Sequence, residues 1–476
     1  MATDFLRTAV QRGPATQDTA SGPPTPSRAW PAVVAVAVGV VAGGYLPQVV
    51  TPFIRRDDWP YLLPTRVPGS FDIYARNLAE GRWLNYLWWL VVGQHESPSL
   101  ASVVYALAYA FFVVGFTRLF DLRGRLATGL LALAVFASPL WERLVYWPAT
   151  LTPSVIVAAL AVWTLPRAAV ARRGLVAWLV LVTVLCVLTY PPVAPILLVA
   201  ALVRVRDRPW RTTLGAGVAF VAGYAVGILS IYALNWIAFG HFGIQIAAWR
   251  HPNAAHNLHD LAVNARRYLS DVRSLARALG WGALGAGTVV GIGALVDRTT
   301  RPAWLRILTG LVLVVAIDGA QTLLTGVATN PRGLLWGWLF AVVPAGLLVS
   351  GVRWGRWVGT IALVALAVSG LLQWRSDVAA HQQTRREYAA IVDAVVARQQ
   401  AERHDVVLYQ DHSLRGTLRG DTVAGTVEAM LYEYGGVASH WCSKVQCAHL
   451  PPARGGSVLP LGPAIVVVLP PPPSWL

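Results

Sequence analysis

The sequence predicts an all-α protein that crosses a membrane about eleven times and carries a small α/β domain after the last span. Three observations predict this fold class. Hydrophobic residues make up 55% of the 476 residues and charged residues only 13%, against about 25% charged in soluble domains. Apolar runs long enough to span a bilayer recur through residues 30–374. Residues 375–476 instead show short helix-like and strand-like patterns.

The apolar runs and their breaks predict the membrane domain, residues 30–374, span by span. Several runs have tryptophan at an end, as in the interfacial belt of membrane proteins. Residues 1–29 are polar and rich in Pro, Thr and Ser, so we expect a disordered cytoplasmic tail and no cleaved signal peptide. The predicted spans are roughly 31–52, 98–119, 126–141, 150–166, 174–189, 191–203, 213–238, 279–296, 304–325, 334–352 and 357–373.

Arginines in the short loops predict the orientation. With residue 1 in the cytoplasm, the short loops on that side are rich in arginine and almost free of acids, as the positive-inside rule requires. An odd number of spans then places residues 375–476 outside the cytoplasm. Cys442 and Cys447 agree with that location, because a disulfide between them is expected only in an oxidising compartment.

Three exoplasmic segments are long enough to carry function. Loop 53–97 contains two short apolar-faced segments, 71–80 and 84–92, which we expect to lie along the membrane surface. Loop 239–278 ends in an amphipathic stretch from residue 258 onward. The domain at 375–476 is predicted to contain helices near 378–402 and 421–433 and strands at 406–409 and 464–469.

The first of these loops begins with two adjacent carboxylates, Asp57 and Asp58, just after the first span. Like charges side by side raise each other's pKa, which suits a group that accepts a proton near neutral pH. Carboxylate oxygens also bind hard divalent cations such as Mg, Mn or Ca. A helix cap or a solvated turn is the alternative interpretation of the pair.

The acidic pair, together with the Gly-Arg-Trp of Asn77–Leu84, resembles the GT-C superfamily of membrane glycosyltransferases. The similarity is to the serotype-converting O-antigen glucosyltransferases, and its motifs lie within the first ~100 residues. The resemblance implies a hexosyl- or pentosyltransferase of the bacterial cytoplasmic membrane. Such an enzyme moves a sugar from a polyprenyl-phosphate donor to a cell-envelope glycan or lipid on the exoplasmic face, with inversion.

The resemblance also implies roles for particular residues. Asp57 is the expected general base, and Asp58 its partner or a ligand for a divalent cation, although no cofactor is required by the sequence. Arg332, just before a late span, is the expected donor-phosphate residue, with a snorkelling arginine as the alternative. Arg55 and Arg56 are further phosphate candidates. The remaining candidates for the substrate pocket are Trp59, Arg82, Glu142, Tyr146, Trp147 and Asp318.

Two other functions remain open on the sequence. A transporter or flippase for a lipid-linked anionic substrate would use Asp318, an acid inside a predicted span, as its coupling group. A non-catalytic envelope scaffold would use the domain at 375–476 to bind partners. No nucleic-acid-binding module is visible, so we assign the net charge of +16 to topology and to anionic membrane lipids.

Overall fold

The computed structural model describes residues 30–63, 72–93, 96–122, 124–351, 353–401, 404–443, 450 and 454–475. About 75% of the structure is helical, and the protein is an all-α membrane protein in its main part. The predicted cytoplasmic tail, 1–29, lies outside the described residues.

Seven helices in the described residues are long and apolar enough to cross a membrane, and a bent pair, Arg125–Phe136 with Pro139–Tyr146, is an eighth candidate. The pair bends by 45°. The first is the segment Pro31–Val50, formed by α1 (Trp30–Val40) from its second residue on, a π-helical turn (Val41–Tyr45) and α2 (Leu46–Val50). The other six are α5 (Pro98–Arg118), α8 (Pro148–Ala168), α11 (Trp210–Phe239), α12 (Leu258–Val296), α13 (Arg301–Thr325) and α15 (Arg353–Ala401).

The predicted count of eleven spans stays a prediction. Three of the predicted ranges coincide with helices that are shorter than a full span: α9 (Arg172–Val187), α10 (Ala194–Arg204) and α14 (Leu339–Ser350). Two of them are thoroughly enclosed, since every residue of α10 except Arg204 is buried, and so is every residue of α14 except Phe340 and Ser350. Enclosure by protein allows a helix to be shorter than the bilayer is thick.

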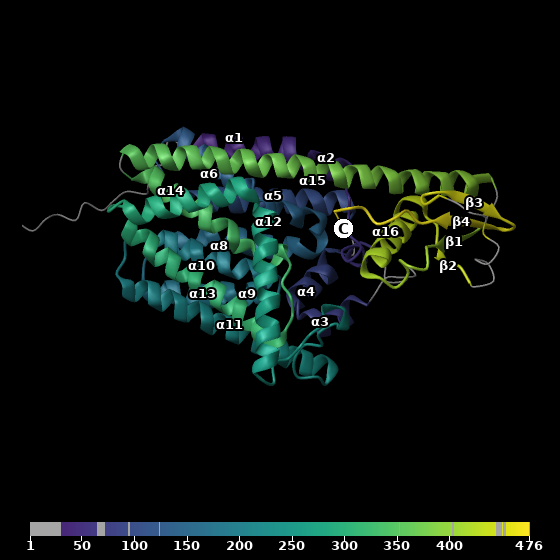
Figure 1. Ribbon diagram of the computed structural model, residues 1–476, viewed down its shortest axis with the longest axis horizontal. Helices are drawn as coiled ribbons and strands as arrows, with labels where there is room; N and C mark the ends of the chain where they lie inside the picture. Colours follow the sequence, from purple (N-terminus) through teal and green to yellow (C-terminus); the bar gives the residue numbers. More distant parts are fainter. Residues whose placement is uncertain are drawn as a thin grey trace, which may run out of the picture.

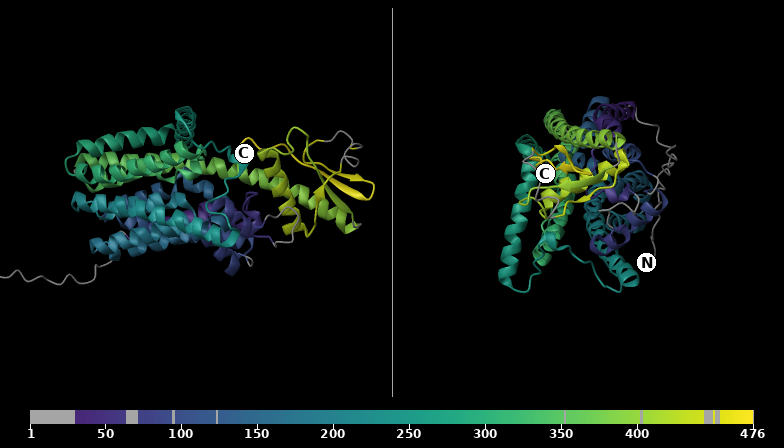
Figure 2. Two further views of the ribbon diagram at one scale, coloured as in Figure 1. Left: turned by 90° about the horizontal axis from the view of Figure 1, so that it is seen from below. Right: turned by 90° about the vertical axis from the view of Figure 1, so that its right-hand side faces the viewer.

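The long helices run side by side along the long axis of the molecule, and the sheet lies beyond one end of this bundle (Figure 1). Helix α15 is continuous over 49 residues and runs from the bundle to the sheet in both side views (Figures 1 and 2). The predicted domain boundary at 374/375 therefore falls inside one helix.

Helix α12 contains a sharp break at Gly280, where φ is 77° and ψ is 155°. Its first half crosses the bundle direction, as Figure 1 shows at the α12 label. A side chain is disfavoured at this backbone conformation, which glycine adopts at no steric cost. The break separates the predicted surface helix near 258–278 from the predicted span 279–296.

Four strands form one sheet in the order β2 (His440–Trp441), β1 (Asp405–Tyr409), β4 (Ala464–Val468), β3 (Val458–Leu461). Strand β1 is parallel to β2 and β4, with Val407 opposite Val466, and β3 is antiparallel to β4. Helix α16 (Leu418–Gly435) packs against α15. The predicted strands at 406–409 and 464–469 coincide with β1 and β4.

The loop that follows α2 is fastened to α15. Thr51 Oγ1 donates to Gln382 Oε1 at 3.0 Å, and Arg385 Nε donates to the carbonyl of Pro52 at 3.2 Å. The ring of Phe53 contacts His381 edge-on at 5.2 Å. The acidic pair therefore lies at the end of the bundle from which α15 continues to the sheet.

Candidate functional site

Asp58 is fully buried and holds the start of α8. Its Oδ2 accepts from the Ala149 amide at 2.9 Å, and its Oδ1 accepts from the Thr150 amide at 2.7 Å and from the Thr150 hydroxyl. Backbone amides in the first turn of a helix lack partners within the helix, and a carboxylate is favoured there. Burial raises the pKa of Asp58 to about 7, and these hydrogen bonds oppose the rise.

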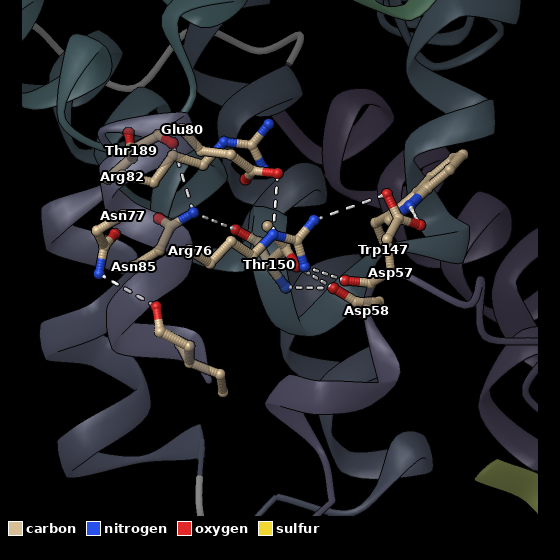
Figure 3. A network of polar contacts seen from close by, with 11 residues as sticks. Asp57, Asp58, Arg76, Asn77, Glu80, Arg82, Asn85, Trp147, Thr150 and Thr189 are labelled. Atoms are coloured by element: carbon tan, nitrogen blue, oxygen red, sulfur yellow. Dashed lines mark hydrogen bonds and ion pairs between the residues drawn. The ribbon is translucent and has the colours of Figure 1, made fainter. Parts of the chain in front are cut away.

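Asp57 has a different setting, because its side chain is 42% exposed. Its Oδ1 accepts from the indole N–H of Trp147 at 2.5 Å, and its Oδ2 lies 3.9 Å from the Arg76 guanidinium. Figure 3 shows the two carboxylates pointing to different partners. Asp57 is thus oriented by a neutral donor while part of its carboxylate remains exposed to solvent.

Arg76, the arginine beside Asp57, belongs to a short helix with a well-defined start and end. Helix α3 (Ile73–Glu80) begins at Asp72, whose side chain accepts from the Tyr74 amide at 2.9 Å, and ends at Gly81 with φ 68°. A Cβ on Gly81 would lie 2.6 Å from Ile231, so glycine is needed for both space and backbone conformation. The chain then reverses into α4 (Trp83–Val91).

Arg76, Glu80 and Arg82 form one ion-pair network (Figure 3). Arg76 Nε is 2.9 Å from Glu80 Oε1, and Arg82 Nη1 is 3.3 Å from Glu80 Oε2. Arg76 also donates to the backbone carbonyl of Asp57 at 2.5 Å. Burial raises the pKa of Glu80, but the two arginines outweigh it and hold that pKa at about 2. Glu80 is therefore ionised throughout the physiological range.

Trp147 joins the exposed carboxylate to two cations. The guanidinium of Arg332 lies 4.1 Å from the Trp147 ring centroid, and that of Arg55 lies 5.0 Å from it. Both are within the range of a cation–π contact. Burial, with a smaller effect of Arg332, lowers the pKa of Arg55 to about 10 despite the opposing charge of Asp57. Arg55 stays a cation at neutral pH.

Charge around Asp57 is predominantly positive. Arg250, in a 3-10 turn (Ala248–Arg250), interacts electrostatically with Glu80, Arg82 and Arg332. Tyr190 donates from its hydroxyl to the Arg332 carbonyl at 3.0 Å. Within the described part of the chain, the Arg332 guanidinium has no carboxylate within 4 Å. The cluster, defined as Asp57, Glu80, Trp147 and the five arginines 55, 76, 82, 250 and 332, therefore suits a phosphate.

The structure brings together four of the predicted site residues, Asp57, Arg55, Trp147 and Arg332, with Arg82 nearby. Arg56 points elsewhere: its side chain packs over Gly425 of α16, and its charge acts on Glu428. Trp59 is buried, donates to the Ile54 carbonyl at 3.1 Å and contacts Tyr434 edge-on. These two residues tie the first loop to α16.

Of the other predicted pocket residues, Tyr146 adjoins the cluster. Its carbonyl accepts from the Arg55 amide at 3.0 Å, and its ring stacks on His381 at 3.7 Å. Glu142 is buried. Asp318, in the middle of α13, accepts from the indole N–H of Trp336, and among the described residues no ion pair or hydrogen bond links it to the Asp57 cluster. Cys442 is disulfide-bonded and Cys186 is a buried free thiol; Cys447 lies outside the described residues.

A divalent-cation site on Asp57 and Asp58 stays a prediction. Both oxygens of Asp58 already accept hydrogen bonds from the start of α8. No group of three or more His, Cys, Asp or Glu side chains with metal-binding geometry occurs among the residues that the structure describes.

Sequence reasoning missed Arg76, Glu80 and Tyr190. The spacing of Arg76 and Glu80, four apart on a predicted helix, is a recognisable ion-pair signal, whereas Tyr190 carries none that distinguishes it from an interfacial anchor. No protein-family model, curated protein or solved structure matches the chain. The function therefore has to be argued from this geometry.

Proposed function

We propose that this protein is a GT-C-type membrane glycosyltransferase that uses a polyprenyl-phosphate sugar. One observation carries the proposal: Trp147 orients the exposed Asp57 carboxylate through its N–H and binds Arg55 and Arg332 against its ring. A general base and two cations for an anionic leaving group thus share one rigid side chain. Catalysis of glycosyl transfer needs both at one reaction centre.

The chemistry follows from this arrangement. An acceptor hydroxyl loses its proton to Asp57 as its oxygen attacks the anomeric carbon. The bond between that carbon and the phosphate oxygen breaks, and the electron pair leaves with the lipid phosphate. Attack opposite the leaving group inverts the configuration. Arg332 and Arg55 stabilise the charge that develops on the phosphate.

The setting of the cluster supports a lipid-borne donor. The cluster lies at one end of a bundle of apolar helices, where a prenyl chain can stay in the bilayer while its phosphate reaches the arginines. We further propose eleven spans, a bacterial cytoplasmic membrane, and an exoplasmic location for this end and for the α/β domain of α16 and the sheet. The acceptor would be an envelope glycan or lipid.

Asp58 serves a different purpose in this proposal. By holding the amides of Ala149 and Thr150 it fixes the start of α8, directly after Trp147. It is a positioning residue, and the base role belongs to Asp57 alone.

The experiment compares purified wild type with Asp57→Asn and Asp58→Asn, using polyprenyl-phosphate sugars and envelope acceptors. We expect Asp57→Asn to lose about 10²–10⁴-fold in the rate of lipid-phosphate release with an unchanged melting temperature. Asp58→Asn should lower the melting temperature, because a cap contributes about 1 kcal/mol. Equal release from wild type and Asp57→Asn would disprove the catalytic proposal.

The transporter alternative gains no specific support from the structure. It needs Asp318 as a coupling acid, and that carboxylate accepts a hydrogen bond from the indole N–H of Trp336. A flux assay in proteoliposomes distinguishes the two functions, since transport would survive Asp57→Asn and fail in Asp318→Asn.

A further inference from the structure

The segment after β4, residues 469–475, returns from the sheet to the Asp57 cluster. It contains four consecutive prolines, Pro470 to Pro473. Arg419 of α16 donates to the Pro473 carbonyl at 3.1 Å, and Leu469 donates its amide to the Tyr409 carbonyl at 2.8 Å. Polyproline is stiff and extended at about 3.1 Å per residue, so this segment acts as a spacer of set length.

The spacer delivers Trp475 onto Arg55. The Arg55 guanidinium lies 4.5 Å from the Trp475 ring centroid, and Trp147 lies 5.0 Å from the same guanidinium. Trp475 also stacks on His381 at 4.0 Å and donates from its indole N–H to Thr384 Oγ1 at 3.2 Å. Helix α15 therefore holds the Trp475 indole through its ring face and through its N–H.

We propose that Trp475 is a positioning residue of the reaction site: with Trp147 it holds the Arg55 guanidinium for the donor phosphate. This inference rests on the proposed function and adds to it a residue 420 positions from Arg55 in the chain. The domain of α16 and the sheet is thereby part of the site and not an appended module.

The contacts of Arg55 support this role. Its Nε is buried without a hydrogen-bond partner among the described residues, an arrangement that is costly unless something else accepts from it. Two aromatic contacts restrain the guanidinium while its Nε–H has no acceptor among the described residues. A phosphate oxygen is the acceptor that a guanidinium matches best.

The test measures binding and turnover in full-length Trp475→Ala, Trp475→Phe and Trp441→Ala. Trp441 is a matched control, because it lies in β2 of the same sheet and also packs against an arginine, Arg415, at 4.9 Å. Binding is measured by native mass spectrometry with undecaprenyl phosphate and, separately, with undecaprenol. Kinetics use the polyprenyl-phosphate sugar that wild type turns over.

We expect Trp475→Ala to bind undecaprenyl phosphate about tenfold more weakly while its binding of undecaprenol is unchanged. Its KM for the donor should rise by a similar factor, and its kcat should fall as well, because Arg55 also stabilises the charge that develops on the leaving phosphate. Trp475→Phe should restore most of the loss, and Trp441→Ala should behave as wild type. A merely structural role for Trp475 would weaken binding of both lipids alike.

The outcomes separate this inference from the proposed function. If Trp475→Ala matches wild type in both assays while Asp57→Asn is inactive, the positioning role is wrong and the glycosyltransferase stands. If wild type neither binds undecaprenyl phosphate nor releases it, both fall.

A second variant guards against misfolding of Trp475→Ala. Replacing Pro470–Pro473 with glycines keeps the indole but removes the stiff spacer. We expect it to raise the donor KM about severalfold and to lower the melting temperature moderately, because glycine increases the entropy of the unfolded chain. An unchanged KM in the folded variant would refute the spacer role.

Discussion

Glu80 holds two arginines of the first loop in place, and its charge gives the loop a defined dependence on pH. Its pKa is about 2 in the folded protein against an ordinary value of 4.5. Since the folded pKa is the lower one, the stabilisation is fully present above pH 4.5. It is lost as the pH falls from about 4.5 towards 2.

We predict that Glu80→Gln lowers the stability by about 3–5 kcal/mol at pH 7, because it leaves Arg76 and Arg82 partly buried without a counter-charge. The difference in melting temperature between wild type and this variant should shrink below pH 4.5. Thermal unfolding in detergent over pH 3–7 measures it. Glu387→Gln, at an exposed site of α15, is the control and should follow wild type at every pH. If the difference in melting temperature between wild type and Glu80→Gln did not change with pH, the ionised Glu80 would not be the source of the stabilisation.

The different roles of the adjacent residues Asp57 and Asp58 could not be predicted from the sequence. Asp57 and Asp58 were predicted as a pair with shared chemistry, and the sequence offered a cap only as an alternative. The helix that Asp58 caps begins about ninety residues later, with Ala149 and Thr150. No local pattern reports a contact of that range, whereas the position of the acidic pair just after the first apolar segment can be read directly from the sequence.

At the scale of elements, the break in α12 depends on one glycine. We predict that Gly280→Ala costs about 1–3 kcal/mol, because φ is 77° and the new Cβ would lie 2.8 Å from Gln373 Nε2. Gly285→Ala in the same helix meets nothing within 4 Å and should stabilise by about 0.5–1 kcal/mol. Melting temperatures of the two variants test this. If Gly280→Ala raised the melting temperature as Gly285→Ala is expected to, a side chain at position 280 would cause no strain and the prediction would be wrong.

The elements also show what periodicity can and cannot predict. The apolar runs predicted the positions of the bundle helices well, because burial in lipid or protein demands apolar side chains in either case. The same fact makes the count of spans uncertain, since α10 and α14 are as apolar as the spans but too short. A break was expected between residues 373 and 378, because Arg375, Ser376 and Asp377 are polar. The helix instead continues through them, since neither Pro nor Gly interrupts it.

At the scale of the whole molecule, the continuity of α15 matters. The half of α15 inside the bundle fixes the rotation of the half beyond it, which contacts the loop after α2. We predict that one alanine inserted after Arg375 abolishes transfer, because it rotates everything beyond by about 100° and turns Gln382 and Arg385 away from Thr51 and Pro52. An alanine inserted after His412, in an exposed turn, should leave activity intact. The measurement is lipid-phosphate release at equal expression; activity in the first variant would show that the two halves are independent.

The packing of the domain at 375–476 against the first loop could not be predicted from the sequence. Helices and strands of the domain at 375–476 follow from local patterns, but the contact of Trp475 with Arg55 joins residues 420 positions apart. A proline run followed by tryptophan was the only available hint, and it does not specify a partner.

The unbroken length of α15 has a mechanical consequence. Its 49 residues measure about 70 Å, of which a bilayer core takes up only about 30 Å. A helix adapts to a thicker or thinner bilayer by changing its tilt, and a rigid rod carries that change to its far end as a lever arm. A tilt of about 5° displaces a point 40 Å outside the bilayer by about 3–4 Å. We therefore expect a change in bilayer thickness to move the sheet, although the sheet itself does not touch the lipid.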